Sequence, residues 1–304
     1  MTIVTKVSLF ILLLIAVTVW LAVFTYPKPT FRLIACDVGQ GDATLAIYGK
    51  NQILVDGGPG RKVLDCLSRY IPFWDRTIEL VVMTHPEKDH FGGLIDVFKN
   101  YSVNNFITSG LDSGTSDFGV LEDQVGSGRA SVHFIKSEHK IGLSLMHLDI
   151  LHPSSEYIAK ISDEKDLSKV DQSTKVLSAF TTTKNKNDSS VVAVLSFGEF
   201  DALLTGDIEN EVSDSIADLL TLSAKREWEY IKIPHHGSRN GLSQKLLDAV
   251  DPEIAVISAG KNNSYGHPHK EVIRLLSDRE IKYFRTDEKG DIIIESNGKS
   301  YWIK

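Results

Sequence analysis

The stretch THPEKDHFGGL, residues 84–94, places two histidines and two acidic residues between an apolar run and a pair of glycines. The run LVVM before it is typical of a buried strand, so the polar cluster begins where that strand should end. In an extended segment His85 and Glu87 point the same way, whereas the adjacent Asp89 and His90 point differently. The segment predicts a metal site, or, taken alone, a solvated turn whose aspartate caps a helix.

Polar residues at the ends of other apolar runs support a metal site. Asp207 ends ALLTGD, His235 and His236 follow YIKIP, and His267 follows IAVISAG. Ligand sites in α/β folds lie beyond the carboxyl ends of strands, so these distant residues should meet at one edge. Imidazole and carboxylate suit Zn²⁺ or Mn²⁺. We therefore expect two divalent ions, bridged by the two oxygens of Asp207.

Short apolar runs alternate with helical stretches from residue 31 to the C-terminus, which predicts an α/β fold. The last residues, DIIIESNGKSYWIK, predict a hairpin on an Asn-Gly turn. Residues 154–187 are polar and long for a connection, so we expect a surface insertion near the mouth of the site. It could be a lid that meets a polyanionic substrate, or a solvated loop without a role.

The N-terminal residues 7–24, VSLFILLLIAVTVWLAVF, carry no charge and are long enough to cross a bilayer as a helix. Trp20, Phe24 and Tyr26 suit a membrane interface better than a signal-peptide cleavage site. We expect residues 1–30 to be a membrane anchor with its linker, the alternative being a signal segment. Residues 31–304 would form a catalytic domain outside the cytoplasm.

The composition is that of an ordinary globular protein, with 304 residues, 42% of them hydrophobic and 24% charged. The net charge of −7 argues against a module that binds nucleic acid through bulk charge. It does not exclude a nuclease, because bound divalent cations supply local positive charge. The two cysteines, Cys36 and Cys66, carry no pairing pattern, so we expect buried free thiols and no cysteine zinc site.

The segment HPEKDHFGG resembles the HxHxDH motif of the metallo-β-lactamase superfamily. The similarity is closest to the soluble domain of ComEC-type competence proteins, which take up DNA across the cell membrane. It rests on DVGQGDA at 37–43, LVDGG at 54–58, NDSSVV at 187–192, LLTGD at 203–207, IPHHGS at 233–238 and YGHP at 265–268. The resemblance covers residues 31–304, but not the channel of those proteins, so only hydrolysis is carried over.

The resemblance implies a site for each of these segments. The implied metal ligands are His85, Asp89, His90, Asp207, His236 and His267, with Glu87 left open because the superfamily has histidine there and this branch aspartate. The implied catalytic residues are Asp89, His235 and His236. Asp37 and Asp56 would orient ligands or stabilise turns, and Asp188 is a weaker ligand candidate.

The resemblance implies an αβ/βα four-layer sandwich and a metal-dependent hydrolase, with phosphodiesterase or nuclease activity as the first expectation. A water activated between two ions would attack phosphorus. The expected partners are a phosphodiester substrate, with DNA as a candidate, and a membrane at the N-terminus; protein partners are left open. The alternatives are hydrolysis of a small envelope phosphodiester, hydrolysis of a lactam, lactone or thioester, and a non-catalytic nucleic-acid-binding module.

Overall fold

The computed structural model describes residues 3–25, 30–162, 176–222 and 226–304. The chain divides into two compact units, Met1–Thr30 and Phe31–Lys304. The first unit contains one helix, α1 (Ile3–Thr25). The expected membrane span is not supported: among the residues that the structure describes, no helix combines the length and hydropathy needed to cross a bilayer. Tyr26 and the linker at 26–29 lie outside the described residues.

The second unit contains two β-sheets. The first has the strand order β15-β14-β1-β2-β3-β4-β5-β6, and the second has the order β13-β12-β11-β10-β9-β8-β7. The strands of the first sheet are β1 (Phe31–Ala35), β2 (Thr44–Tyr48), β3 (Asn51–Val55), β4 (Thr77–Met83), β5 (Ser102–Thr108), β6 (Ser131–Phe134), β14 (Ile292–Ser296) and β15 (Tyr301–Ile303). Those of the second are β7 (Lys140–Leu143), β8 (Met146–His152), β9 (Val192–Phe197), β10 (Phe200–Leu204), β11 (Tyr230–Lys232), β12 (Ile254–Ile257) and β13 (Lys282–Arg285).

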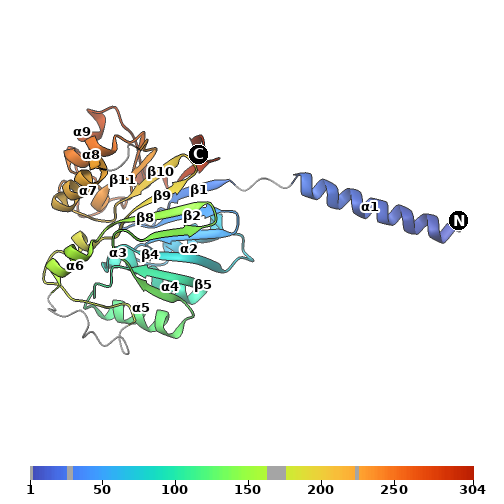
Figure 1. Ribbon diagram of the computed structural model, residues 1–304, viewed down its shortest axis with the longest axis horizontal. Helices are drawn as coiled ribbons and strands as arrows, with labels where there is room; N and C mark the ends of the chain where they lie inside the picture. The colour runs from blue at the N-terminus through green and yellow to red at the C-terminus, as the bar shows by residue number, and fades with distance from the viewer. Residues whose placement is uncertain (1–2, 26–29, 163–175, 223–225) are drawn as a thin grey trace. The chain divides into compact units, whose positions relative to one another are not determined.

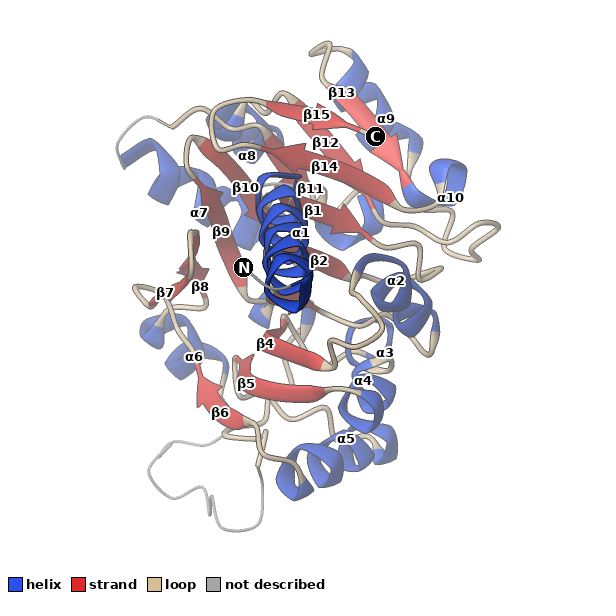
Figure 2. Ribbon diagram, turned by 90° about the vertical axis from the view of Figure 1, so that its right-hand side faces the viewer, coloured by secondary structure: helices blue, strands red, loops and turns tan. Residues whose placement is uncertain are grey.

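Helices cover the outer face of each sheet, and Figure 1 shows the two groups on opposite sides of the strands. The helices α2 (Lys62–Tyr70), α4 (Leu94–Asn100) and α5 (Ser116–Ser127) pack on the first sheet. The second sheet is covered by α7 (Asn210–Leu222), α8 (Gln244–Val250) and α9 (Lys270–Ser277). Figure 2 shows the same strands between helices from a perpendicular direction. The predicted α/β fold with two sheets is confirmed.

The LVVM run shows why the sheets are buried on both faces. Leu80 and Val82 belong to the core between the sheets, whereas Val81 and Met83 belong to the core under the helices of the first sheet. A strand covered on both faces needs apolar side chains at consecutive positions, because successive side chains point to opposite faces. The continuous run therefore fixes β4 in the middle of the stack and brings the polar segment 84–94 to its carboxyl end.

Several elements have no clear signal in the sequence. They are α5, β6, β7, α9 and β13, whose apolar patterns are short or interrupted. The polar insertion at 154–187 begins with α6 (Ser155–Ile161), where the hydroxyl of Ser154 caps the helix by accepting from the Tyr157 amide. Its residues 163–175 lie outside the described residues, and so do three of its lysines.

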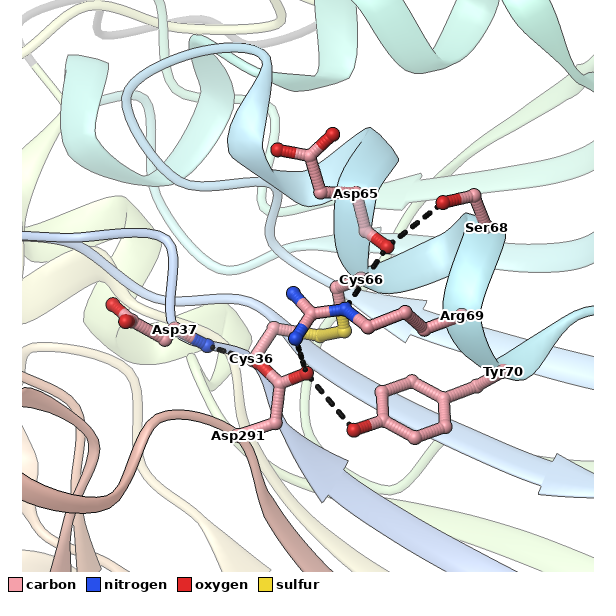
Figure 3. The surroundings of a disulfide bond; sticks show 8 residues. All are labelled: Cys36, Asp37, Asp65, Cys66, Ser68, Arg69, Tyr70 and Asp291. Atoms are coloured by element: carbon pink, nitrogen blue, oxygen red, sulfur yellow. Dashed lines mark hydrogen bonds and ion pairs between the residues drawn. A yellow bond between two sulfur atoms is a disulfide. The ribbon is translucent and has the colours of Figure 1, made fainter.

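The prediction of free thiols is wrong, because Cys36 and Cys66 form a disulfide (Figure 3). Cys36 directly follows β1 and Cys66 lies on the buried face of α2. Packing of α2 on the sheet brings their Cα atoms to 5.9 Å, within the usual range for a disulfide. Since 30 residues separate the two cysteines, only tertiary packing could reveal the pair.

Candidate metal centre

The polar segments meet where parallel strands end. His85 follows β4, Asp207 follows β10, His236 follows β11 within the turn η3 (Pro234–Gly237), and His267 follows β12. The turn before Asp207 requires glycine, because Gly206 has φ +56° and a Cβ there would lie 2.7 Å from the Cβ of Ser190. The strand-end arrangement expected from the sequence therefore exists in the fold.

His85 is completely buried and has one ring nitrogen held in place. Its Nδ1 lies 3.1 Å from the hydroxyl of Thr84 and 3.2 Å from that of Ser190. Its Nε2 is buried without a hydrogen-bond partner. Burial, together with the nearby His90, lowers the pKa of His85 to about 3, so the ring is neutral at neutral pH. A neutral imidazole with an unpaired nitrogen is what a metal ligand requires.

His90 is oriented by a carboxylate behind it. Its Nδ1 lies 2.7 Å from Oδ2 of Asp56. Asp56 is itself fixed, because it accepts from both the amide and the hydroxyl of Thr84, at 2.8 and 2.7 Å. The Nε2 of His90 thus points at Asp207, 3.2 Å from its Oδ2. This geometry is the carboxylate–imidazole arrangement proposed for Asp56. Burial opposes the charged ring, but Asp207 and Asp56 outweigh it and raise the pKa of His90 well above its ordinary value.

The centre of the site is a cluster of four residues, Asp89, His90, Asp207 and His236, which we call the central cluster. Each offers one ligand atom, and these atoms lie within 4.8 Å of one another. His236 Nε2 is 3.1 Å from Oδ2 of Asp207 and 3.4 Å from Oδ2 of Asp89. Its Nδ1 lies 3.0 Å from the carbonyl of Ser258, which orients the ring. His236 rather than His235 therefore faces the cluster.

A buried lysine, which the sequence analysis missed, completes the site. Lys232 is 3% exposed, and its ammonium donates to Asp42 Oδ2, to the Gly206 carbonyl at 2.7 Å and to Asp207 Oδ1 at 3.2 Å. One lone pair of Asp207 Oδ1 thus accepts from Lys232, and bridging of two ions by the two oxygens of Asp207 stays a prediction. The signal was present, because Lys232 is a charge inside the apolar run YIKIP and Asp42 lies in DVGQGDA.

The other predicted residues surround the central cluster at different depths. His267 has a ring centroid 6.3 Å from that of His236, and its buried Nδ1 has no hydrogen-bond partner. Burial and the neighbouring His236 and His235 lower the pKa of His267 to about 4. The side chain of His235 is 22% exposed, whereas that of His236 is 2% exposed. The Nε2 of His235 lies 3.4 Å from Asn187 Nδ2.

Three predicted residues are not part of the cluster. The side chain of Glu87 is 43% exposed and lies 3.7 Å from the ammonium of Lys186. Asp188 accepts from the Glu209 amide at 2.9 Å, and Asp37 accepts from the amide of Gly39 within its own turn. Among the described residues, these three take part in none of the groups able to hold an ion. Coordination by Glu87 stays a prediction.

The donor set fits divalent ions of the zinc and manganese type. Among the described residues, a buried ring nitrogen without a hydrogen-bond partner occurs at five histidines of this region, namely His85, His90, His235, His236 and His267. Buried polar atoms of this kind are rare unless something binds them. Imidazole nitrogen and carboxylate oxygen suit these ions, and the cysteines are committed to a disulfide.

Comparisons with known proteins agree with this site. Residues 36–261 match the family model described as the metallo-beta-lactamase superfamily. The chain is 26% identical over 305 residues to ComE operon protein 3 of Bacillus subtilis, covering 91% of this chain and 35% of that protein. It is 26% identical over 255 residues to Recombination protein 2 of Haemophilus influenzae, covering 82% and 27%. The chain thus spans between about a quarter and a third of the length of these relatives.

The fold agrees with a solved structure. The metallo-beta-lactamase fold protein YhfI from Bacillus subtilis aligns with a TM-score of 0.55 at 10% sequence identity. The alignment covers 88% of this chain and 100% of YhfI. At this identity the likeness shows the fold alone.

Proposed function

The chain belongs to the metallo-β-lactamase superfamily, and from that premise we propose that it is a metal-dependent phosphodiesterase that acts on polynucleotides. The observation that carries the proposal is the central cluster, in which His90 and His236 direct unpaired ring nitrogens toward one oxygen of Asp207. The names of two relatives, Recombination protein 2 and Competence protein ComA of Neisseria gonorrhoeae, which is 24% identical over 268 residues, support the substrate class, since recombination and competence both handle DNA.

In this proposal the chain's residues have separate roles. The central cluster would hold a divalent ion, with His85 and His267 as further ligands. When bound, such ions polarise a phosphoryl oxygen and make bound water more acidic. Asp56 orients His90, and Lys232 holds Asp207 so that Oδ2 faces the cluster. His235, whose side chain is partly exposed, would donate a hydrogen bond to phosphoryl oxygens.

An aromatic ring at the mouth favours a polynucleotide over a small diester. Tyr265 is 66% exposed, and its ring stacks on His267 with centroids 5.7 Å apart and planes at 24°. Asn263 holds this loop by donating to the His267 carbonyl at 2.6 Å and accepting from its amide at 3.0 Å. An exposed ring on a fixed loop can stack a nucleobase, which is how proteins bind single strands without sequence preference.

The test is a turnover screen of the full chain with Zn²⁺ or Mn²⁺. The substrates are bis(p-nitrophenyl) phosphate, single-stranded DNA, double-stranded DNA and a lactam. We expect hydrolysis of the diester and of DNA. Asp207→Ala should lose at least one ion, measured by elemental analysis, and nearly all turnover. Asp117→Ala, which removes an exposed carboxylate paired with Lys88, is the matched control and should change neither.

The same screen separates the alternatives. Turnover of bis(p-nitrophenyl) phosphate without DNA cleavage would indicate a small-phosphodiester hydrolase, and turnover of the lactam alone a different hydrolase. DNA binding without cleavage, in a chain that retains its ions, would indicate a binding module. Full metal content and turnover in Asp207→Ala would remove the proposed site.

A further inference from the structure

Two adjacent aromatic side chains stand in solvent in the loop between α2 and β4. Phe73 is 79% exposed and Trp74 is 71% exposed. Their rings contact each other edge to face, with centroids 5.0 Å apart. Single exposed apolar residues are common, but two large neighbouring aromatic rings form an exposed apolar patch, which marks an interaction site. We call this pair the aromatic tip.

The aromatic tip lies at the end of the first sheet opposite the candidate metal centre. It precedes β4, whereas His85 follows β4, and the seven residues of that strand span about 23 Å. The register of β3 with β4 pairs Ile53 with Leu80, which places the turn between β2 and β3 at the level of the tip. The chain also enters the domain at this end, where Arg32 donates to the Tyr70 carbonyl at 3.2 Å.

Exposed cations lie at the same end of the first sheet as the aromatic tip. They are Lys50 in the β2–β3 turn, Arg76 beside the tip and Lys99 in the last turn of α4. The acid next to Trp74 is turned inward, because Asp75 accepts from the Thr77 amide and from Gln52 Nε2, both at 3.2 Å. The acids Glu199 and Glu253 contact the β14–β15 hairpin, where the Glu199 amide donates to the Gly298 carbonyl at 2.7 Å and the Tyr301 hydroxyl donates to Glu253. This hairpin is four strands away from β4 in the sheet order.

We propose that this end of the domain docks on an anionic lipid surface, with Phe73 and Trp74 inserted among the headgroups. Aromatic side chains prefer the membrane–water interface, and juxtaposed lysine and arginine are attracted to anionic lipids. A protein partner fits less well. Two aromatic side chains bury about 150–250 Å² each, less than the roughly 800 Å² per partner of a standard protein interface.

This orientation has a consequence for the metal centre. With the tip on the bilayer, the strand ends that carry the central cluster point away from the lipid. The site would then be open to a substrate in solution. The inference does not depend on which substrate is hydrolysed, since the residues of the tip and those of the cluster are different.

The test measures how strongly lipid quenches the fluorescence of Trp74 in the full chain. Trp20→Phe removes the tryptophan of α1, so that helix contributes no signal. The chain is mixed with vesicles of brominated phosphatidylcholine and phosphatidylglycerol, and quenching of tryptophan emission is measured. Trp302 is 39% exposed, so Trp302→Phe is included in every chain of the test. We expect a quenched fraction that disappears when Trp74→Phe is added to this background. Trp228 is 5% exposed and should not be quenched.

Two further variants test the charges and the location. The double variant Lys50→Glu with Arg76→Glu should bind anionic vesicles more weakly, with affinity falling about fivefold for each cation lost, and should therefore show less quenching. High salt should also weaken binding, because it screens the attraction between the cations and the lipid. Tyr265→Ser, an exposed aromatic at the opposite end, is the control and should leave the quenching unchanged.

Two results would overturn the proposal. One is a quenched fraction that is the same with and without Trp74. The other is protection of Trp74 from acrylamide that rises with protein concentration in the absence of lipid, together with a dimer by light scattering. That second result would assign the tip to contact between two copies of the chain.

Discussion

The ammonium of Lys232 lies 3.2 Å from Oδ1 of Asp207, and both side chains are almost completely buried. The same ammonium pairs with Asp42. Burial opposes the charge of Asp207, but His236, His90 and Lys232 outweigh it and hold the pKa of that carboxyl well below its usual range. Lys232 therefore keeps one oxygen of Asp207 occupied and leaves Oδ2 facing the central cluster.

Lys232→Met should destabilise the fold by about 3–5 kcal/mol, because it leaves two buried carboxylates without their counter-charge. It should also reduce metal affinity, since Asp207 loses the contact that orients it. Urea unfolding and metal titration measure the two effects. Lys140→Met is the matched control: its ammonium is exposed, 3.3 Å from Asp149, and its loss should cost no more than about 1 kcal/mol. Equal effects of both variants would contradict a special role for Lys232.

Glu87→Gln should leave metal content nearly unchanged, because the side chain is partly exposed and faces Lys186 rather than the central cluster. Asp89→Asn, two residues further on, should strongly reduce the affinity for at least one ion. Parallel metal titrations of the two variants give the comparison. A large loss of affinity in Glu87→Gln would show that this carboxylate coordinates directly.

Tyr265→Ala should lower kcat/KM on single-stranded DNA by about 5- to 150-fold, since stacking of a base on an aromatic ring contributes about 1–3 kcal/mol. Turnover of bis(p-nitrophenyl) phosphate should stay the same, and Tyr265→Phe should retain the wild-type rate on DNA. Trp302→Ala, another exposed aromatic, is the control. An equal loss of kcat/KM on both substrates would mean that Tyr265 stabilises the metal centre rather than binding single-stranded DNA.

His152 should make stability depend on pH. Burial lowers its pKa to about 4 from an ordinary 6.5, while its Nε2 donates to the Asp188 carbonyl at 2.8 Å. The neutral ring's contribution is complete above pH 6.5 and is lost as the pH falls toward 4, because only the unfolded chain takes up the proton there. The loss at pH 4 is about 3 kcal/mol.

His152→Gln keeps a donor to the Asp188 carbonyl but does not titrate in this range. Urea unfolding of both chains in chelator, at pH 7.5 and pH 4.5, isolates the effect of His152 as a difference. The wild type should lose more of its free energy of unfolding than the variant when the pH falls from 7.5 to 4.5. A difference in free energy of unfolding between the two chains that is the same at both pH values would contradict this account.

Replacing both cysteines, Cys36→Ala with Cys66→Ala, should lower the free energy of unfolding by about 3–4 kcal/mol, because the bond closes a loop of 30 residues in the unfolded chain. Reduced wild type should unfold at nearly the same urea concentration as the double variant. Identical midpoints for oxidised and reduced wild type would show that the bond adds no stability.

Much of the site could be predicted from sequence because its residues follow apolar runs. A run such as LVVM identifies a buried strand, and the residue after it must lie at the edge of a sheet. His85, Asp207 and His267 each follow such a run, as does the pair His235 and His236, so the local pattern predicts that they lie at one edge. The α/β class follows from the same alternation of short strands and helices, and the two-sheet sandwich is implied by the resemblance.

Other features of the site and fold depend on contacts between distant segments, which the local pattern of apolar residues does not reveal. The choice of His236 over His235 depends on the turn η3, where both residues have positive φ and only one ring enters the cluster. The Cys36–Cys66 bond depends on how α2 packs, and the contact of Lys232 with Asp42 and Asp207 joins three segments. The sequence by itself determined which residues end strands, because burial imposes an apolar pattern that can be read locally. Only the tertiary structure decided which of those residues face one another, because that depends on packing between segments far apart in the chain.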